Sequence, residues 1–85
     1  MAAGRYFLAD VALSALLVLS KRQCLQILAA LDQIAEDPIG SVSAIGNDWD
    51  GRLVKLARFG RLEIGYILSP DGKMVTFTFI RPRKR

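Results

Sequence analysis

The sequence predicts an α+β fold in which an N-terminal strand and a helix hairpin pack on a small antiparallel β-sheet. Three observations support this class. Apolar residues recur at helical spacing before Pro38, they alternate at strand spacing after Arg52, and a turn-forming segment from Ser69 to Gly72 divides the second half. With 85 residues and 52% hydrophobic content, the chain suits one domain, residues 1–85, with one core.

The N-terminal segment predicts a short strand followed by a short helix. Arg5 to Ala9 is aromatic and apolar, which favours a strand that joins an edge of the sheet. Asp10 can cap a helix from about Val11 to Leu19, because its side-chain oxygen can accept from free backbone N–H groups. The apolar face of this helix is expected to hold Leu13, Leu16 and Leu17.

A second helix is predicted to begin at Ser20. Ser20 and Gln23 have the spacing of a capping box, in which each side chain bonds the backbone N–H of the other. The helix should end near Asp37, because Pro38 disfavours helical geometry in the preceding residue. Its apolar stripe consists of Cys24, Ile27, Leu28, Leu31 and Ile34. Together the two helices form a hairpin whose apolar faces require a sheet to cover them.

Pro38 to Gly51 is rich in Gly, Ser, Asn and Asp and has no regular period. It predicts a loop of about fourteen residues that wraps the surface or holds a short turn. Trp49 is expected to fold onto the edge of the core, with a base-stacking platform as the alternative.

Three strands are predicted to form a meander, from Leu53 to Ala57, Arg61 to Leu68 and Met74 to Ile80. In the first strand Lys55 shares a face with Leu53 and Ala57, opposite Val54 and Leu56. The inward positions of the later strands are Leu62, Ile64, Tyr66 and Leu68, then Val75, Phe77 and Phe79.

Composition excludes several kinds of chemistry. The chain has no His and one Cys, so it has no internal disulfide, and it lacks the ligands of a structural zinc site. No Gly-rich phosphate loop occurs, and Cys24 on its apolar stripe is interpreted as core filler. We therefore expect no metal and no small-molecule cofactor. The same lack of disulfide and zinc ligands predicts a cytoplasmic protein. The apolar run from Tyr6 to Ser20 is too short to span a bilayer and contains Asp10, so we expect a buried helix and no membrane partner.

Positive charge is concentrated after Arg52. Residues 52–85 contain nine basic and two acidic residues, which gives +7, whereas residues 1–51 contain three basic and six acidic residues, which gives −3. This imbalance predicts a polyanionic partner such as nucleic acid. A hairpin with Ser69 to Gly72 as its turn would bring Arg61 and Arg81 together as a phosphate clamp. Further nucleic-acid contacts are predicted for Arg58, Lys73, Arg83, Lys84 and Arg85. The alternative is a solvated basic surface.

Two segments carry a resemblance to a known family. LSKRQCLQILAALDQIAEDP looks like the second helix of the RelE/ParE superfamily of bacterial toxins, and FGRLEIGYILSPDGKMVTFTFIRPRKR looks like its core hairpin and basic exit. The resemblance covers nearly the whole chain. It implies a RelE-like fold and the toxin role of a type II toxin-antitoxin system, with a cognate antitoxin as partner. RelE-branch toxins enter the ribosomal A site and cleave mRNA by attack of a 2′-hydroxyl on the adjacent phosphate. By position, the resemblance implies catalytic roles for Lys55, Arg61 and Arg81.

The sequence departs from the RelE pattern at its C-terminal segment. Ribosome-dependent members commonly place a Tyr or His there, whereas this chain ends at Arg85 with neither. Tyr66 has the strand parity of the core, and Glu63 is interpreted as an ion-pair partner of arginines rather than a base. The resemblance therefore leaves enzymatic activity open. The alternatives are a ParE-like non-catalytic inhibitor of DNA gyrase and a non-toxic nucleic-acid-binding module.

Overall fold

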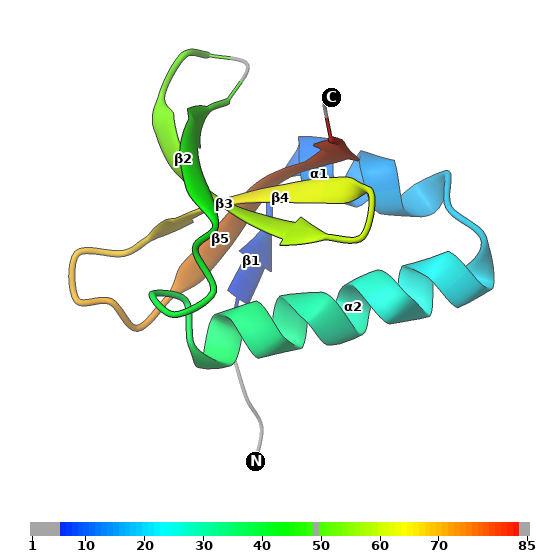
Figure 1. Cartoon of the computed structure of the whole chain (residues 1–85), viewed down its shortest axis with the longest axis horizontal. Helices are drawn as coiled ribbons and strands as arrows, with labels where there is room; N and C mark the ends of the chain where they lie inside the picture. Colours follow the sequence, from blue (N-terminus) through cyan, green and yellow to red (C-terminus); the bar gives the residue numbers. More distant parts are fainter. Residues whose placement is uncertain (1–5, 49, 84–85) are drawn as a thin grey trace.

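The computed structural model describes residues 6–48 and 50–83, which form two helices and a five-stranded sheet (Figure 1). The elements are β1 (Tyr6–Leu8), α1 (Asp10–Leu17), α2 (Lys21–Glu36), β2 (Ala44–Asn47), β3 (Leu53–Phe59), β4 (Leu62–Leu68) and β5 (Val75–Pro82). The sheet order is β1-β5-β4-β3-β2. β1 runs parallel to β5 at one edge, and all other neighbours are antiparallel. The predicted α+β class, meander and N-terminal edge strand are confirmed, although the sheet is mixed.

β2 was not predicted, because it lies in the segment interpreted as a loop. It pairs with β3 in a register that places Gly46 opposite Val54. A Cβ at Gly46 would lie 2.7 Å from Cδ1 of Leu56, so the glycine leaves room for that side chain. Asp48 shapes the connection to β3, since its Oδ1 accepts from the backbone N–H groups of Asp50 and Arg52 at 2.8 and 3.0 Å. The prediction for Trp49 falls outside the described residues.

The helix α1 differs in detail from its prediction. Its N-cap is Ala9, without a side-chain cap, and Asp10 is the first helical residue, so the predicted Asp10 cap is wrong. The helix buries Ala12 and Leu16 against β5, whereas Leu13 and Leu17 are exposed. The face was misassigned because a pattern of large apolar residues underweights the small Ala12, which is fully buried.

The helix α2 follows its prediction. The Ser20–Gln23 capping box is present, and the helix ends at Glu36, before Asp37 and Pro38. Ile27, Leu31 and Ile34 are buried. Cys24 and Leu28 pack against the same core, as the predicted stripe requires. Neither helix of the described chain combines the length and apolar content that crossing a lipid bilayer requires.

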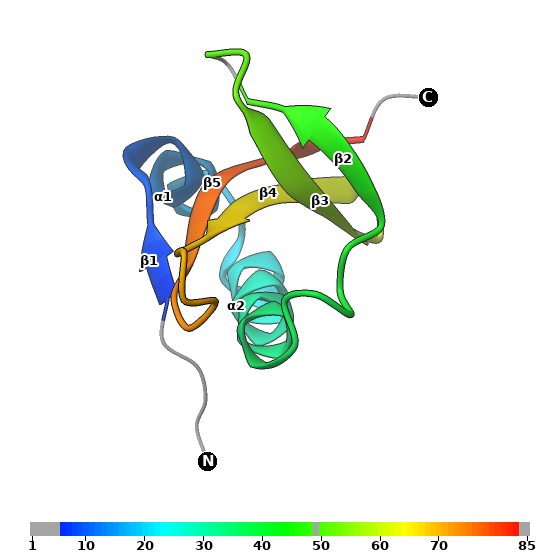
Figure 2. The same cartoon turned by 90° about the vertical axis from the view of Figure 1, so that its left-hand side faces the viewer.

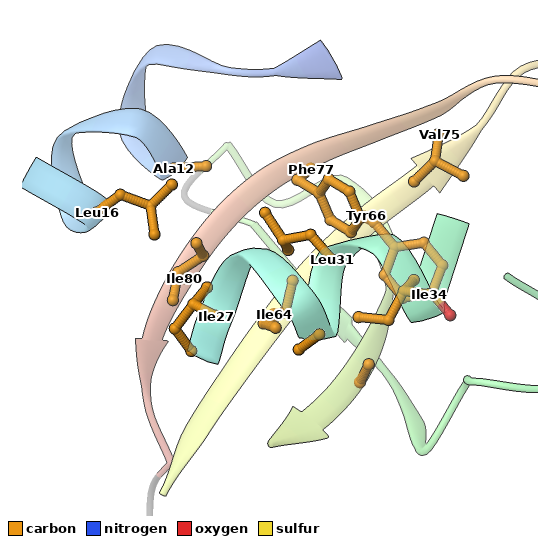
Figure 3. Close-up of a cluster of buried hydrophobic side chains, with 12 residues drawn as sticks. Ala12, Leu16, Ile27, Leu31, Ile34, Ile64, Tyr66, Val75, Phe77 and Ile80 are labelled. Atoms are coloured by element: carbon orange, nitrogen blue, oxygen red, sulfur yellow. The ribbon is translucent and has the colours of Figure 1, made fainter. Parts of the chain in front are cut away.

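Both helices cover one face of the sheet (Figure 2). Leu31 of α2 lies beside Tyr66 and Phe77 at the centre of the core, and Leu16 of α1 belongs to the same cluster (Figure 3). The rings of Tyr66 and Phe77 are tilted against each other with centroids 5.9 Å apart. The opposite face of the sheet carries no helix among the described residues and is free to hold a site.

A β-bulge in β5 changes which side chains reach each face. Tyr66 lies opposite Phe77, but Gly65 lies opposite Phe79, so Thr78 is an additional residue in β5. After the bulge the alternation is inverted. Ile80 therefore joins the core under the helices, and Phe79 packs with Val54 and Leu56 on the opposite face. The prediction that Phe79 faces the same side as Phe77 is wrong for this reason.

Candidate nucleic-acid interface

Arg58, Glu63 and Arg81 form a row across β3, β4 and β5 on the face away from the helices. The register places Arg58 opposite Glu63 and Glu63 opposite Arg81. Arg81 donates from Nε to Oε1 of Glu63 at 3.3 Å, and Nε of Arg58 lies 3.9 Å from Oε2. We call these three residues the arginine–glutamate row.

The row combines a buried carboxylate with two accessible cations. The Glu63 side chain is 11% exposed, whereas those of Arg58 and Arg81 are 47% and 40% exposed. Burying a carboxylate is unfavourable unless it is paired, and two guanidinium groups fulfil that condition here. The guanidinium of Arg81 also lies over the ring of Phe79, with its carbon 4.3 Å from the ring centroid. The row therefore presents a net charge of one positive unit at the surface of the sheet.

The predicted cross-strand pair of Arg61 and Arg81 is not formed. Arg61 lies in the turn between β3 and β4, and its carbonyl accepts from the backbone N–H of Arg83 at 2.7 Å. Arg81 instead lies opposite Glu63. The register differs from the prediction because residues 69–74 separate β4 from β5, a longer connection than the predicted turn, and because the bulge adds one more residue. Arg61 and Arg81 are thus two positions apart along neighbouring strands.

Arg61 lines a different part of the surface from Arg81. It lines a hollow between α2 and the β3–β4 turn, together with Gln23, Gln26 and Phe59. This hollow lies on the helix side of the sheet, whereas the arginine–glutamate row lies on the other side.

Lys55 lies on the helix side of the sheet. Its register partners are Ile45 on β2 and Tyr66 on β4, and Tyr66 belongs to the core under the helices. Arg58 is three residues further along the same strand and therefore points to the opposite face. Lys55 and Arg81 are consequently separated by the sheet. Lys55 lines a second hollow with Ile45, Leu53 and Leu68.

The other predicted contacts are distributed along the sheet. Arg83 donates from Nη1 to the carbonyl oxygen of Gly60 at 3.0 Å, close to the arginine–glutamate row. Lys73 is exposed in the β4–β5 connection, at the other end of β5 from Arg81. Lys84 and Arg85 fall outside the described residues.

Tyr66 serves the core, as its strand parity predicted. Its side chain is fully buried, and its hydroxyl donates to the carbonyl oxygen of Pro38 at 2.6 Å. Burial, reinforced by the nearby Asp37 carboxylate, raises the pKa of Tyr66 to about 12. The Tyr66 hydroxyl is thus buried and bonded to Pro38 on the helix side of the sheet, away from the arginine–glutamate row.

The sequence analysis predicted Arg58 as a nucleic-acid contact and Glu63 as an ion-pair partner of arginines, but it did not predict that the two residues pair with each other. The signal that identifies the pair is the two-residue connection Gly60-Arg61, in which Gly60 has a φ of 60°. Such a turn places Phe59 opposite Leu62, and hence Arg58 opposite Glu63. Across residues 6–48 and 50–83, no group of three or more metal-ligating side chains comes together.

Comparison with known proteins identifies the fold. No protein-family model and no curated protein sequence matches the chain. Solved structures do. A chain of the RelE-RelB complex from the archaeon Pyrococcus horikoshii OT3 is 19% identical, with a TM-score of 0.74 over 96% of this chain and 97% of that chain. A chain of the RelBE2 toxin-antitoxin complex from Mycobacterium tuberculosis is 16% identical, with a TM-score of 0.73 over 94% and 98%.

The isolated RelE toxin of E. coli is also similar. It is 16% identical and gives a TM-score of 0.71 over 98% of this chain and 87% of that chain. At such identities the similarity concerns the course of the backbone and not individual side chains. It extends over nearly all of the helices and strands described above. The chain therefore has the fold of the RelE toxins, as the resemblance in its sequence predicted.

Proposed function

We propose that residues 1–85 form the toxin domain of a bacterial type II toxin-antitoxin system, and that the toxin is a ribosome-dependent mRNA endonuclease of the cytoplasm. The fold is common to RelE toxins, two of which are similar to this chain in complexes with their antitoxins. The observation that carries the choice of ligand is the arginine–glutamate row, because it offers two accessible guanidinium groups on an open sheet face. Guanidinium groups are well suited to bind phosphate oxygens.

In the proposed reaction, the 2′-oxygen of a nucleotide bonds to the adjacent phosphorus while the bond from phosphorus to the 5′-oxygen breaks, which yields a 2′,3′-cyclic phosphate and a 5′-hydroxyl. The 2′-hydroxyl gives its proton to water, and the leaving 5′-oxygen takes one proton from water. Negative charge grows on the phosphoryl oxygens during this step, and fixed cations stabilise it. Arg81 is the residue we assign to that phosphate. Arg61 would approach from the β3–β4 turn, and Lys55, on the other face, would attract the RNA without touching the same phosphate.

A second candidate is a ParE-like inhibitor of DNA gyrase without catalysis. This candidate is favoured because neither tyrosine of the described chain is available for proton transfer. Tyr66 is buried and its hydroxyl bonds the carbonyl oxygen of Pro38. Tyr6 packs edge-on against Phe77, with ring centroids 5.0 Å apart. Burial, with a smaller effect of the Asp32 carboxylate, raises the pKa of Tyr6. Neither phenol is placed to transfer a proton at the arginine–glutamate row.

For either toxin, we propose a cognate antitoxin that lays an acidic or amphipathic segment over the basic sheet face or the helix pair. An acidic segment on the sheet face would compete with the phosphates for Arg58 and Arg81. The remaining partners would be the ribosome and mRNA, or DNA gyrase in the second case.

The test is inducible expression in bacteria with analysis of message integrity. The wild-type chain should arrest growth and produce mRNA cut within translated frames. Arg81→Ala and Arg61→Ala should lose both effects, whereas Lys21→Ala, which removes an exposed cation on α2, should retain them. Growth arrest with intact mRNA would refute the endonuclease. Inhibition of supercoiling by purified gyrase would then support the second candidate.

A further inference from the structure

We propose that Glu63 is a positioning residue that holds Arg58 and Arg81 as a two-guanidinium site for the phosphodiester backbone of single-stranded RNA. The choice of RNA as ligand rests on the proposed function. The site itself rests on how the carboxylate divides its two oxygens. Oε1 accepts from Nε of Arg81, and Oε2 faces Nε of Arg58.

Pairing through Nε leaves the more useful part of each guanidinium free. A guanidinium has one N–H on Nε and four on its two Nη atoms, and the Nη groups are those that fork around a phosphate. In the described part of the chain, the one hydrogen bond that these two guanidinium groups make is the bond from Nε of Arg81 to Glu63. Glu63 therefore holds Arg81 by a hydrogen bond and attracts Arg58 electrostatically across 3.9 Å, and neither contact occupies the Nη groups that would bind the ligand.

The position of Glu63 on the middle strand explains why both arginines depend on it. Neighbouring strands lie about 4.8 Å apart, so Arg58 and Arg81 originate roughly 10 Å from each other on either side of β4. Two cations at that distance repel, and free arginine side chains populate many rotamers. The buried carboxylate of Glu63 attracts both guanidinium groups and so limits the rotamers that the two arginines adopt. The ring of Phe79, on which the Arg81 guanidinium lies, further limits the rotamers of Arg81.

If the ion pair served stability alone, the change in RNA affinity caused by Glu63→Gln would have the opposite sign. If Glu63 served stability alone, Glu63→Gln would add one positive charge to the sheet face and strengthen the binding of a polyanion. If Glu63 positions the arginines, the same substitution weakens RNA binding in spite of the added charge. The amide of Gln has one acceptor oxygen in place of two and cannot hold both guanidinium groups.

The experiment measures the affinity of the purified full chain for a fluorescein-labelled oligouridylate by fluorescence anisotropy, over a series of NaCl concentrations. We expect Glu63→Gln to weaken binding by about tenfold, equivalent to roughly 1.4 kcal/mol. The slope of log affinity against log salt should become shallower by about 0.7 for each phosphate contact that is lost. The matched control is Glu36→Gln, which makes the same charge change at the exposed end of α2 and should bind as tightly as the wild type or slightly more tightly.

Thermal denaturation monitored by circular dichroism shows which variants are folded. If Glu63→Gln does not fold, Glu63→Asp decides the question, because it keeps the charge but shortens the carboxylate so that it reaches one arginine at a time. Weaker RNA binding by Glu63→Asp, beside unchanged binding by Glu36→Asp, supports the proposal. A folded Glu63 variant that binds RNA as tightly as the wild type overturns it.

The proposed function and this inference fail separately. Intact mRNA in cells that express the wild-type chain would refute the endonuclease, while a Glu63-dependent RNA affinity in vitro would keep the site. Cleaved mRNA combined with unchanged RNA affinity of the Glu63 variants would refute the site and keep the endonuclease.

Discussion

Arg81 bonds Glu63 at 3.3 Å, and its guanidinium also lies over the ring of Phe79, a residue that is 4% exposed. One arginine therefore shields an aromatic ring on the open face of the sheet and neutralises a buried carboxylate. The Arg81 side chain thus contributes to stability and to the proposed phosphate binding, so variants at this position must be tested for both properties.

We expect Arg81→Ala to lower the free energy of unfolding by about 1–3 kcal/mol, because Glu63 would keep only the longer contact with Arg58. Urea denaturation of the purified protein measures this change. Arg83→Ala, which removes an exposed hydrogen bond to Gly60, should cost about 1 kcal/mol or less. Equal losses in the two variants would show that Arg81 has no special role in stability. Arg81→Lys keeps the charge and separates loss of activity from loss of folding.

Gly65→Ala should destabilise the protein through a clash with Phe79. A Cβ at residue 65 would lie 2.5 Å from both Cε2 and Cζ of that ring, which packs directly over the glycine. Overpacking of this kind costs about 1–3 kcal/mol. Phe79→Leu provides the control, since the double variant should lose less stability than the sum of the two single changes. Additive losses in urea denaturation would place the strain elsewhere.

Tyr66 predicts a loss of stability in alkaline solution. An unfolded tyrosine releases its proton near pH 10.0, whereas the pKa of Tyr66 in the folded protein is about 12. Its stabilising contribution is therefore complete below pH 10 and declines as the pH rises toward 12, because the unfolded state loses its proton first. Urea denaturation across this pH range should show the decline, and Tyr66→Phe should flatten it. Tyr66→Phe should also cost about 1 kcal/mol at neutral pH, through the lost bond to Pro38.

Ser20→Ala should destabilise α2 at its first turn. The Ser20 hydroxyl accepts from the N–H of Gln23 at 3.2 Å, and the Gln23 side chain accepts from the N–H of Ser20 at the same distance. Loss of such a cap costs about 1 kcal/mol, which a thermal melt detects as a lower Tm. Ser14→Ala changes an exposed serine within α1 and serves as the comparison. If both variants melt at the same temperature, the cap contributes nothing.

The sequence alone determined those features that depend on neighbouring residues. The capping box at Ser20, the end of α2 before Pro38 and the apolar stripe with Ile27, Leu31 and Ile34 are set by spacing within one helix. The meander followed from strand alternation, and the inward position of Tyr66 from its parity. The RelE-like fold could be predicted from the sequence because these local signals occur in the order that the fold requires.

The tertiary structure decided how those elements meet. The bulge at Thr78 inverted the faces of β5 and placed Arg81 opposite Glu63. The pairing of β2 with β3 needs Gly46, because a Cβ there would meet Leu56. Lys55 and Arg81, which the resemblance implied to be catalytic together, lie on opposite faces of the sheet. Such outcomes depend on register, and one added residue in a strand moves every later side chain to the other face. The position of such an added residue depends on contacts between distant segments, so it cannot be predicted from the apolar pattern of a single strand.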